Sequence, residues 1–291
     1  MNGFGSIGSR ILQFIKDDPE IQVIGVGKYS PDSKVNEVLS SGFSVYVPKS
    51  KESEFKNFEI SGNIETALND CDLVIDASPG GIGFQNKKNL YEPKNLLAIY
   101  QGGESIVGEN AVSDLLFNSR VNYSDAFEKK HVMQGSCNVT GMGRILEPLR
   151  NKYGENIRRF DVTLIRRWAD IEQNDKDVPD TIELTEHPHH GEDVKSYFGK
   201  DAPLFVRAIK VPTRQMHLHI MDIRFNSNAP SPDELHSVFK DEYGVATIWT
   251  AKGTKDVRDF ANSMNFSFKD TNMIHIPVSY THLTLPTNRE V

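Results

Sequence analysis

The sequence predicts two domains, an α/β domain built on a parallel sheet and an α+β domain with a mainly antiparallel sheet. In the N-terminal half, short apolar segments typical of buried strands each end in a glycine-rich loop, and a helical pattern precedes them. In the C-terminal half, longer strand-like segments follow one another without a helical pattern between them, at residues 161–165, 204–211 and 217–225. The first pattern favours a doubly wound sheet and the second favours antiparallel neighbours.

The N-terminal motif is a G-x-G-x-x-G formed by Gly3, Gly5 and Gly8, with apolar residues at helical spacing after it. These glycines allow a tight turn and a close backbone approach, so that the helix N-terminus can meet a pyrophosphate. We expect the following strands at residues 21–26, 73–77 and 96–100, with glycine-rich loops at 78–83 and 101–104. This order predicts a Rossmann-type NAD(P)-binding domain over residues 1–136, and the alternative is that the glycines only form turns.

Two further expectations concern the N-terminus of this domain and residues 111–117. The glycine-rich turn of such a domain follows a strand, yet only Met1 and Asn2 precede Gly3. The sequence therefore predicts that the first strand is missing and that the centre of the parallel sheet has a gap. Residues 111–117 are expected to form a helix.

Lys28 lies where the second predicted strand ends, and no carboxylate follows before Asp32. An acidic residue at this place would bind a ribose 2′-hydroxyl and favour NAD, whereas a cation can neutralise a 2′-phosphate. NADP is therefore admissible beside NAD. The alternative is that Lys28 is an ordinary solvated lysine.

The second domain is predicted over residues 137–278, and Cys137 lies at the expected start of its first helix. Backbone N–H groups and the helix dipole at this place lower the pKa of a thiol and can stabilise an oxyanion. Cys71 lies between Asp70 and Asp72, whose charges oppose thiolate formation, so Cys137 is the better nucleophile. The alternative for Cys137 is an inert buried cysteine.

Histidines and arginines supply the remaining reactive groups. His217 and His219 fall on one face of a predicted strand and could present an imidazole to the thiol, as base and as hydrogen-bond donor. Adjacent histidines and arginines suit anionic phosphate groups: His189, His190, Arg166 and Arg167. The alternatives are half-exposed strand histidines and a solvated strand edge. No cluster of carboxylates or cysteines accompanies the histidines, so no metal site is predicted.

The composition of the chain argues against several classes of protein. The 291 residues carry a formal net charge of −7, which argues against nucleic-acid binding through counterion release. No stretch approaches the roughly 18 consecutive apolar residues of a membrane helix. The N-terminus has neither a basic region nor an apolar run after it, so we expect no signal peptide. Two cysteines are too few for a disulfide framework, so we expect a reducing, cytoplasmic setting.

Several of these motifs together resemble the archaeal-type (type II) phosphorylating glyceraldehyde-3-phosphate dehydrogenases. Residues 136–141, S-C-N-V-T-G, are similar to the S-C-N-T-T-G nucleophile motif of that family, and residues 2–10 to its N-G-Y-G-T-I-G-K-R opening. The match covers residues 2–278 and continues through these segments in order: D-A-S-P-G-G-I-G at 76–83, I-Y-Q-G-G-E at 99–104, R-R-W-A-D at 166–170, H-H at 189–190 and V-P-T-R-Q-M-H-L-H at 211–219.

The resemblance implies an activity and assigns residues to it. Cys137 would attack the aldehyde of glyceraldehyde 3-phosphate, hydride would pass to NAD or NADP, and inorganic phosphate would release 1,3-bisphosphoglycerate, in glycolysis or gluconeogenesis. His217 would be the catalytic histidine, with His219 as the alternative. Substrate contacts would come from Ser136, Cys137, Asn138, His189 and His190. Cofactor contacts would come from Gly3, Gly5, Ser6, Ile7, Gly8, Lys28, Gly102, Gly103, Arg166 and Arg167.

The resemblance also implies a homotetramer, with no membrane or nucleic-acid partner. It fades after residue 277, and we expect residues 279–291 to be a non-native, disordered tail in place of the family's closing helix. The alternatives are a related thiol-based semialdehyde or acyl-phosphate reductase, and a truncated nucleotide-binding fragment without catalysis.

Overall fold

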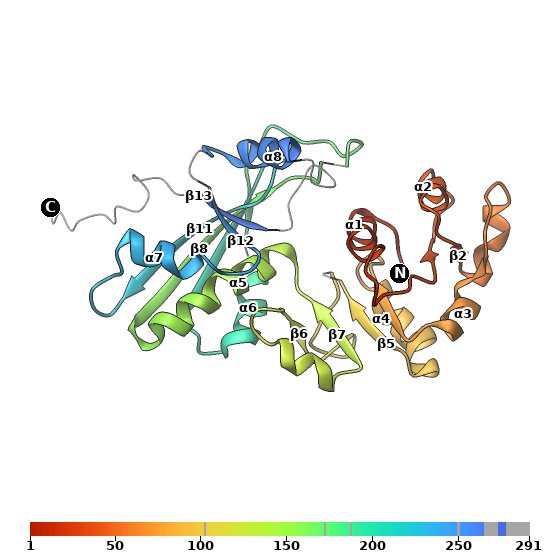
Figure 1. Ribbon diagram of the computed structural model, residues 1–291, viewed down its shortest axis with the longest axis horizontal. Coiled ribbons are helices and arrows are strands. Elements are labelled where there is room, and N and C mark those ends of the chain that lie inside the picture. The colour runs from red at the N-terminus through yellow and green to blue at the C-terminus, as the bar shows by residue number, and fades with distance from the viewer. Residues whose placement is uncertain (102, 172, 187, 249–250, 265–272, 278–291) are drawn as a thin grey trace. The chain divides into compact units, whose positions relative to one another are not determined.

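The computed structural model describes residues 1–101, 103–171, 173–186, 188–248, 251–264 and 273–277. The chain forms two compact units, Met1–Ser136 and a second unit that begins at Cys137 (Figure 1). Residues 279–291, for which we predict a disordered tail, lie outside the described residues. None of the helices in the described ranges is both long enough and apolar enough to span a membrane.

The first unit is built of short parallel strands with helices between them. Its strands are β1 (Val26–Gly27), β2 (Val45–Val47), β3 (Gly62–Asn63), β4 (Leu73–Asp76), β5 (Leu97–Tyr100), β6 (Leu116–Phe117) and β7 (His131–Gln134). Its α-helices are α1 (Ser6–Ile15), α2 (Lys34–Ser40), α3 (Ile64–Ala67) and α4 (Ile82–Asn86), and its shorter helical turns are η1 (Lys49–Phe55), η2 (Leu68–Asp70), η3 (Lys87–Tyr91), η4 (Glu92–Lys94) and η5 (Tyr123–Glu128). The strand orders are β1-β2-β3 and β4-β5-β7-β6, and every pairing is parallel.

Met1 and Asn2 join these two ladders. Asn2 forms a parallel bridge to Gly27 at the end of β1 and another to Asp76 at the end of β4. The N–H of Asn2 donates to the carbonyl of Ile75 at 2.8 Å, and the N–H of Gly27 donates to the carbonyl of Met1 at 2.8 Å. Two residues therefore occupy the sheet position where we predict a gap, and a cavity of about 390 Å³ lies beside them.

The predicted helix at residues 111–117 is wrong. Within this range the structure has β6, which pairs with β7, and a bridge between Ala111 and Ser105. Leu116 is buried against the sheet, so tertiary pairing outweighs the local helical pattern here.

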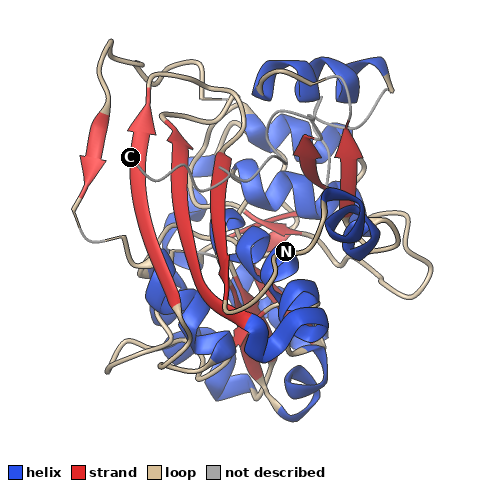
Figure 2. Ribbon diagram, turned by 90° about the vertical axis from the view of Figure 1, so that its left-hand side faces the viewer, coloured by secondary structure: helices blue, strands red, loops and turns tan. Residues whose placement is uncertain are grey.

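The second unit combines a long mixed sheet with helices. Its strands are β8 (Ile157–Arg167), β9 (Glu183–Thr185), β10 (Leu204–Val211), β11 (Leu218–Phe225), β12 (Val245–Ile248) and β13 (Ile274–Pro277). Its helices are α5 (Cys137–Tyr153), α6 (His190–Phe198), α7 (Pro232–Phe239) and α8 (Thr254–Ser263), with the turn η6 (Gly154–Asn156). Figure 2 shows the long strands side by side.

The larger sheet has the order β11-β8-β10-β9. β11 pairs with β8 and β9 pairs with β10 in antiparallel fashion, but β10 runs parallel to β8 over eight residues. The expectation that no helix intervenes between these strands is wrong, because α6 lies between β8 and β10. A crossover connection of this kind is what a parallel pair requires. The sheet is thus mainly antiparallel by pairings, with one parallel pair at its centre.

One face of this sheet is covered and the other is open. Val162 and Leu164 of β8 are fully buried, and α5 and α6 lie on their side, since a Cβ at Gly141 would meet His219 and a Cβ at Gly191 would meet Val206. The opposite face exposes large apolar side chains from three strands: Leu184 (76% exposed), Phe205 (48%) and Ile220 (54%).

Candidate functional site

The glycine motif of the first unit forms a backbone cradle at the start of α1. Gly3 has φ 96°, and a Cβ at Gly8 would lie 2.2 Å from the carbonyl oxygen of Gly3. No side chain caps this end of α1 within the described residues, so the first-turn N–H groups are available to an anion. A Cβ at Gly5, by contrast, would meet nothing within 4 Å. This arrangement fits the pyrophosphate of a dinucleotide.

The loops that follow β4 and β5 approach one another beside this cradle. A Cβ at Gly80 would lie 2.7 Å from the carbonyl oxygen of Gly103, so the two loops touch through their backbones. A Cβ at Gly3 would likewise lie 2.7 Å from the backbone of Ala77, at the end of β4. Gly102 lies outside the described residues. The predicted cofactor residues Gly3, Ser6, Ile7, Gly8 and Gly103 thus gather at the carboxyl edge of one sheet.

A buried polar cluster that we do not predict supports this edge. Asp76, 3% exposed, accepts hydrogen bonds from the Tyr91 hydroxyl at 2.5 Å, the Asn86 amide at 2.9 Å and the Ser78 N–H at 2.9 Å. Asn2 Nδ2 donates to the same Tyr91 oxygen at 2.6 Å. Burial and the Asp76 charge raise the pKa of Tyr91 well above its usual value. The position of Asp76 at the end of a predicted strand is the signal that could have indicated it.

Lys28 is not a solvated lysine, because only 5% of it is exposed. Its Nζ donates to Asp32 Oδ1 at 2.8 Å. Close by, Lys51 Nζ donates to the carbonyl of Tyr29 at 3.0 Å. Two ammonium groups and a carboxylate therefore gather around the end of β1. The Lys28 ammonium is paired with Asp32, four residues further along the chain.

Cys137 is the first residue of α5, and it is exposed. The helix begins at the thiol itself, where the sequence predicts its start, so the backbone N–H groups of its first turn follow the thiol directly. Desolvation by the surrounding protein nevertheless raises the pKa of Cys137. The Arg167 guanidinium and the Asn138 N–H act in the opposite direction without outweighing it. The expected net lowering of the thiol pKa is therefore wrong.

The two histidines near β11 have different partners. His217 lies one residue before β11, and the N–H of Arg167 donates to its Nδ1 at 3.0 Å. His219 Nε2 lies 2.9 Å from Asn138 Oδ1, which connects β11 to the first turn of α5. Burial lowers the pKa of His217 to about 3 and that of His219 to about 4, and the Arg167 charge adds to the effect at His217.

His189 and His190 stand at the start of α6 with their rings stacked, 4.3 Å between centroids. His189 Nδ1 lies 2.7 Å from Asp193 Oδ2, and this hydrogen bond raises the pKa of His189. His190 is 2% exposed, and burial lowers its pKa to about 4. The Arg166 charge acts on His189, His190 and His217, so these predicted residues share one electrostatic environment in the second unit.

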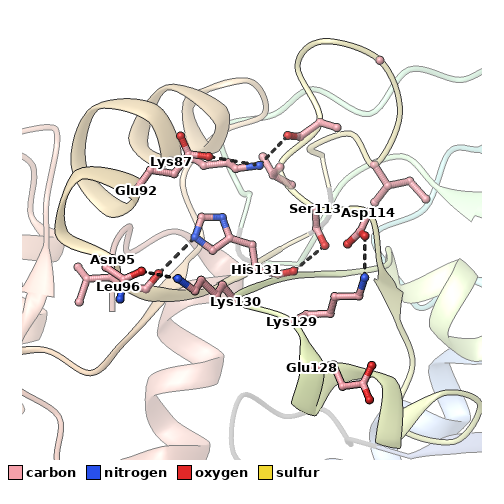
Figure 3. Close-up of a pocket in the computed structure, with 14 residues that line it drawn as sticks. Lys87, Glu92, Asn95, Leu96, Ser113, Asp114, Glu128, Lys129, Lys130 and His131 are labelled. Atoms are coloured by element: carbon pink, nitrogen blue, oxygen red, sulfur yellow. Dashed lines mark hydrogen bonds and ion pairs between the residues drawn. The ribbon is translucent and has the colours of Figure 1, made fainter.

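A cavity of about 590 Å³ lies at the other edge of the sheet in the first unit (Figure 3). Its lining includes Leu96, just before β5, and His131, the first residue of β7. His131 Nε2 bonds the Leu96 carbonyl at 3.2 Å, Lys87 Nζ donates to the Ala111 carbonyl at 3.1 Å, and Lys129 pairs with Asp114 at 2.6 Å. None of the predicted site residues lines this cavity, and its basic groups are bound to the protein. We therefore assign the reaction elsewhere.

Metal binding has no support in the described part of the chain, where no three His, Cys, Asp or Glu side chains gather closely enough to hold an ion. The histidine pairs carry arginines as neighbours instead. Their chemistry suits anions rather than cations.

Comparison with known proteins identifies the family. No family model matches the chain. The chain is 32% identical over 299 aligned residues to the glyceraldehyde-3-phosphate dehydrogenase of Methanothermus fervidus. The alignment covers 99% of this chain and 85% of that protein. The glyceraldehyde-3-phosphate dehydrogenase of Halobacterium salinarum is 34% identical over 241 residues, 80% of this chain and 69% of that protein.

Solved structures agree on the fold. The NADP complex of aspartate semialdehyde dehydrogenase from Candida albicans aligns with a TM-score of 0.61 and 14% identity, over 88% of this chain and 83% of that chain. Aspartate semialdehyde dehydrogenase II of Vibrio cholerae aligns with a TM-score of 0.55 and 12% identity, over 79% and 83%. These likenesses confirm the predicted fold class. Sequence identity over nearly the whole chain goes further: the protein belongs to the archaeal-type glyceraldehyde-3-phosphate dehydrogenase family.

Proposed function

We propose that the protein oxidises glyceraldehyde 3-phosphate to 1,3-bisphosphoglycerate, with NAD or NADP and inorganic phosphate, as part of glycolysis or gluconeogenesis. The observation that carries the proposal is the exposed Cys137 at the start of α5, with Arg167 as its charged neighbour. A thiolate at this place can attack an aldehyde carbon, and the N–H groups of the first turn can stabilise the oxygen.

The residues beside the nucleophile and further residues of the second unit hold the substrate. Ser136 and Asn138 flank the nucleophile, and His219 anchors Asn138 through its side-chain oxygen. His189, His190 and Arg166 provide hydrogen-bond donors and positive charge for a phosphate group. His217, beside Arg167, is the imidazole that we assign to the reacting oxygen.

The first unit binds the cofactor. Gly3, Gly5 and Gly8 leave room for the pyrophosphate at the N-terminus of α1, where Ser6 and Ile7 form the first turn. Gly103 contributes from the loop after β5, whereas Arg166 and Arg167, which the resemblance also implies as cofactor contacts, belong to β8 of the second unit. When bound there, a nicotinamide cofactor would supply the hydride acceptor. Lys28 is the group that we assign to an NADP 2′-phosphate.

Copies of the chain assemble into a homotetramer in a cytoplasmic, reducing compartment, where Cys71 and Cys137 stay unpaired. The open sheet face with Leu184, Phe205 and Ile220 supports assembly, because such an apolar face is costly in water. Light scattering should report a smaller particle for Ile220→Lys than for the wild type. Tyr243→Lys, at an 85% exposed site away from this face, is the matched control.

The deciding experiment follows cofactor reduction by absorbance. We expect reduction of NAD or NADP with glyceraldehyde 3-phosphate that depends on inorganic phosphate. Aspartate semialdehyde serves as the competing substrate, and a preference for it would favour a semialdehyde dehydrogenase instead. Cofactor binding without turnover of either aldehyde would contradict the catalytic role.

A further inference from the structure

The cavity of about 590 Å³ in the first unit has the position and the size of a ligand site that the proposed reaction does not use (Figure 3). It lies where β5 and β7 begin, since its lining includes Leu96 and His131. The cofactor cradle lies at the opposite, carboxyl ends of the strands. The cavity volume falls within the range of roughly 300 to 1,000 Å³ that is usual for small-molecule sites. A ligand held here would not compete with the cofactor for space.

Two lysines of the lining differ in how their charge is balanced. The ammonium of Lys129 pairs with the Asp114 carboxylate at 2.6 Å, so this pair carries no net charge. The ammonium of Lys130 donates instead to the side-chain oxygen of Asn95, which is a neutral acceptor. An ammonium group has three N–H donors, so one hydrogen bond does not exhaust it. Lys130 therefore keeps its positive charge and can donate to a ligand in the cavity.

Lys87, the third lysine of the lining, is largely removed from water. Only 15% of its side chain is exposed, and its Nζ donates to the Ala111 carbonyl, another neutral acceptor, at 3.1 Å. Oε1 of Glu92 lies 3.9 Å away, and the Glu92 carboxylate is already hydrogen-bonded to Lys88 at 3.0 Å. Burial lowers the pKa of Lys87 as a result. A bound anion would stabilise this ammonium in place of the water that it has lost.

The other polar groups of the cavity leave this positive charge in place. His131 is neutral at pH 7, because burial lowers its pKa, and its Nε2 bonds the Leu96 carbonyl at 3.2 Å. Figure 3 shows Lys87 and Lys130 on opposite sides of the His131 ring. Glu128 also lines the cavity, but it lies on the far side of it from Lys87. The part of the cavity around the imidazole is therefore suited to an anion.

We propose that this cavity binds a small phosphate monoester through the ammonium groups of Lys87 and Lys130. Two positive charges match the two negative charges of the phosphate group, which lysine binds as a point charge. The carbon skeleton of the ester lies against Leu96 and Ile106, the apolar part of the lining. An ester is favoured over free phosphate because it fills more of the cavity and covers this apolar part.

The first test follows the Lys87 side chain by NMR, with the signal identified by its loss in Lys87→Gln. The probe is glycerol 3-phosphate, used above its second pKa of about 6 so that it is a dianion. The Lys87 signal should shift and saturate, glycerol alone should leave it unchanged, and inorganic phosphate should bind more weakly. No shift with either phosphate compound would overturn the proposal. Tighter binding of inorganic phosphate would overturn the assignment to an ester.

The second test uses two matched lysine variants. Lys130→Gln should weaken the binding of glycerol 3-phosphate at least about tenfold, because a charge-assisted hydrogen bond is lost. Lys94→Gln is the control and should bind as the wild type does. The Lys94 ammonium also has a neutral amide partner, Asn69, but it does not belong to the cavity lining. Unchanged affinity in Lys130→Gln, or an equal loss in both variants, would show that the phosphate group does not bind in this cavity.

Discussion

The two thiols of the chain differ in access and in charge. Cys137 is exposed and has the Arg167 guanidinium as a neighbour, whereas Cys71 is half-buried, donates to the Ala67 carbonyl at 3.4 Å and has Asp70 and Asp72 beside it. Iodoacetamide should therefore label Cys137 faster than Cys71, as mass spectrometry of the digested protein can measure. Cys137→Ser should abolish aldehyde oxidation and leave cofactor binding nearly unchanged.

A substitution at Arg167 provides a second test of this prediction. Removing its guanidinium in Arg167→Met raises the thiol pKa further, so the labelling rate of Cys137 at pH 7 should fall while that of Cys71 stays the same. Equal labelling of both cysteines, or full activity of Cys137→Ser, would show that the nucleophile is assigned wrongly.

The pair of Lys28 and Asp32 controls cofactor preference in our proposal. Lys28→Glu should weaken NADP binding by about 1.5 to 3 kcal/mol and spare NAD, because a charge-assisted contact to the 2′-phosphate is lost. Asp32→Asn should act in the opposite direction, since it frees the Lys28 ammonium from its carboxylate partner. Titration of both variants with both cofactors measures the ratio. An unchanged ratio in both would mean that the ion pair only stabilises the end of β1.

At the scale of single residues, the sequence indicates which side chains matter better than it indicates their electrostatic state. Cys137 could be singled out because its helix start is readable from the apolar pattern after it. The sign of its pKa shift could not, because desolvation depends on tertiary neighbours that are distant in the sequence. The sequence also could not predict that Lys28 is buried and paired with Asp32, because a short irregular segment has no periodic pattern of apolar residues.

Within the turn before α1, the structure separates two glycines that the motif treats alike. Gly8→Ala should destabilise the first unit, because its Cβ would lie 2.2 Å from the Gly3 carbonyl oxygen. Gly5→Ala should fold normally, since Gly5 has φ −91° and open space around it, yet its methyl group would project into the space that we assign to the pyrophosphate. Thermal unfolding and cofactor titration distinguish the two effects.

One result for each variant would contradict the role that we assign to its glycine. If Gly5→Ala binds NAD and NADP as tightly as the wild type does, the pyrophosphate does not lie at the N-terminus of α1. If Gly8→Ala unfolds at the wild-type temperature, the close approach to Gly3 is not essential to the turn.

At the scale of elements, several strands follow from the sequence, but the predicted strand at residues 21–26 shortens to β1 (Val26–Gly27), and the connections do not follow. β4, β5, β8, β10 and β11 follow from their apolar runs within a few residues. The parallel pairing of β8 with β10 did not follow, because α6 is polar at its start and its helical pattern is short. The predicted helix at residues 111–117 failed because burial of Leu116 against the sheet is a tertiary effect.

Considered as a whole, the protein should lose stability as the pH falls. Burial lowers the pKa of His190, His217 and His219 to about 4, 3 and 4, below the ordinary value of 6.5. The unfolded chain therefore binds more protons than the folded one between pH 6.5 and about 4. Stability from these groups is complete above pH 6.5 and declines as the pH falls through that window, by up to about 1.4 kcal/mol per pH unit for each proton.

Tryptophan fluorescence can measure this effect, because Trp168 and Trp249 both follow residue 136 in the sequence. The urea midpoint should fall between pH 7 and pH 5, and His190→Gln should reduce the slope. His189 has a raised pKa, but it is exposed and opposes the trend only weakly. A urea midpoint independent of pH over this window would contradict the neutral, buried state of the three histidines.

The bridge made by Asn2 has a consequence for how the first unit opens. Its two ladders, β1-β2-β3 and β4-β5-β7-β6, are held in one sheet by the backbone of two residues and by the bond from Asn2 to Tyr91. Such a narrow seam is the place where a cooperative sheet divides into two independently opening segments. In amide hydrogen exchange, Gly27 and Ala77, whose N–H groups donate to Met1 and Asn2, should exchange together and earlier than the interior of either ladder.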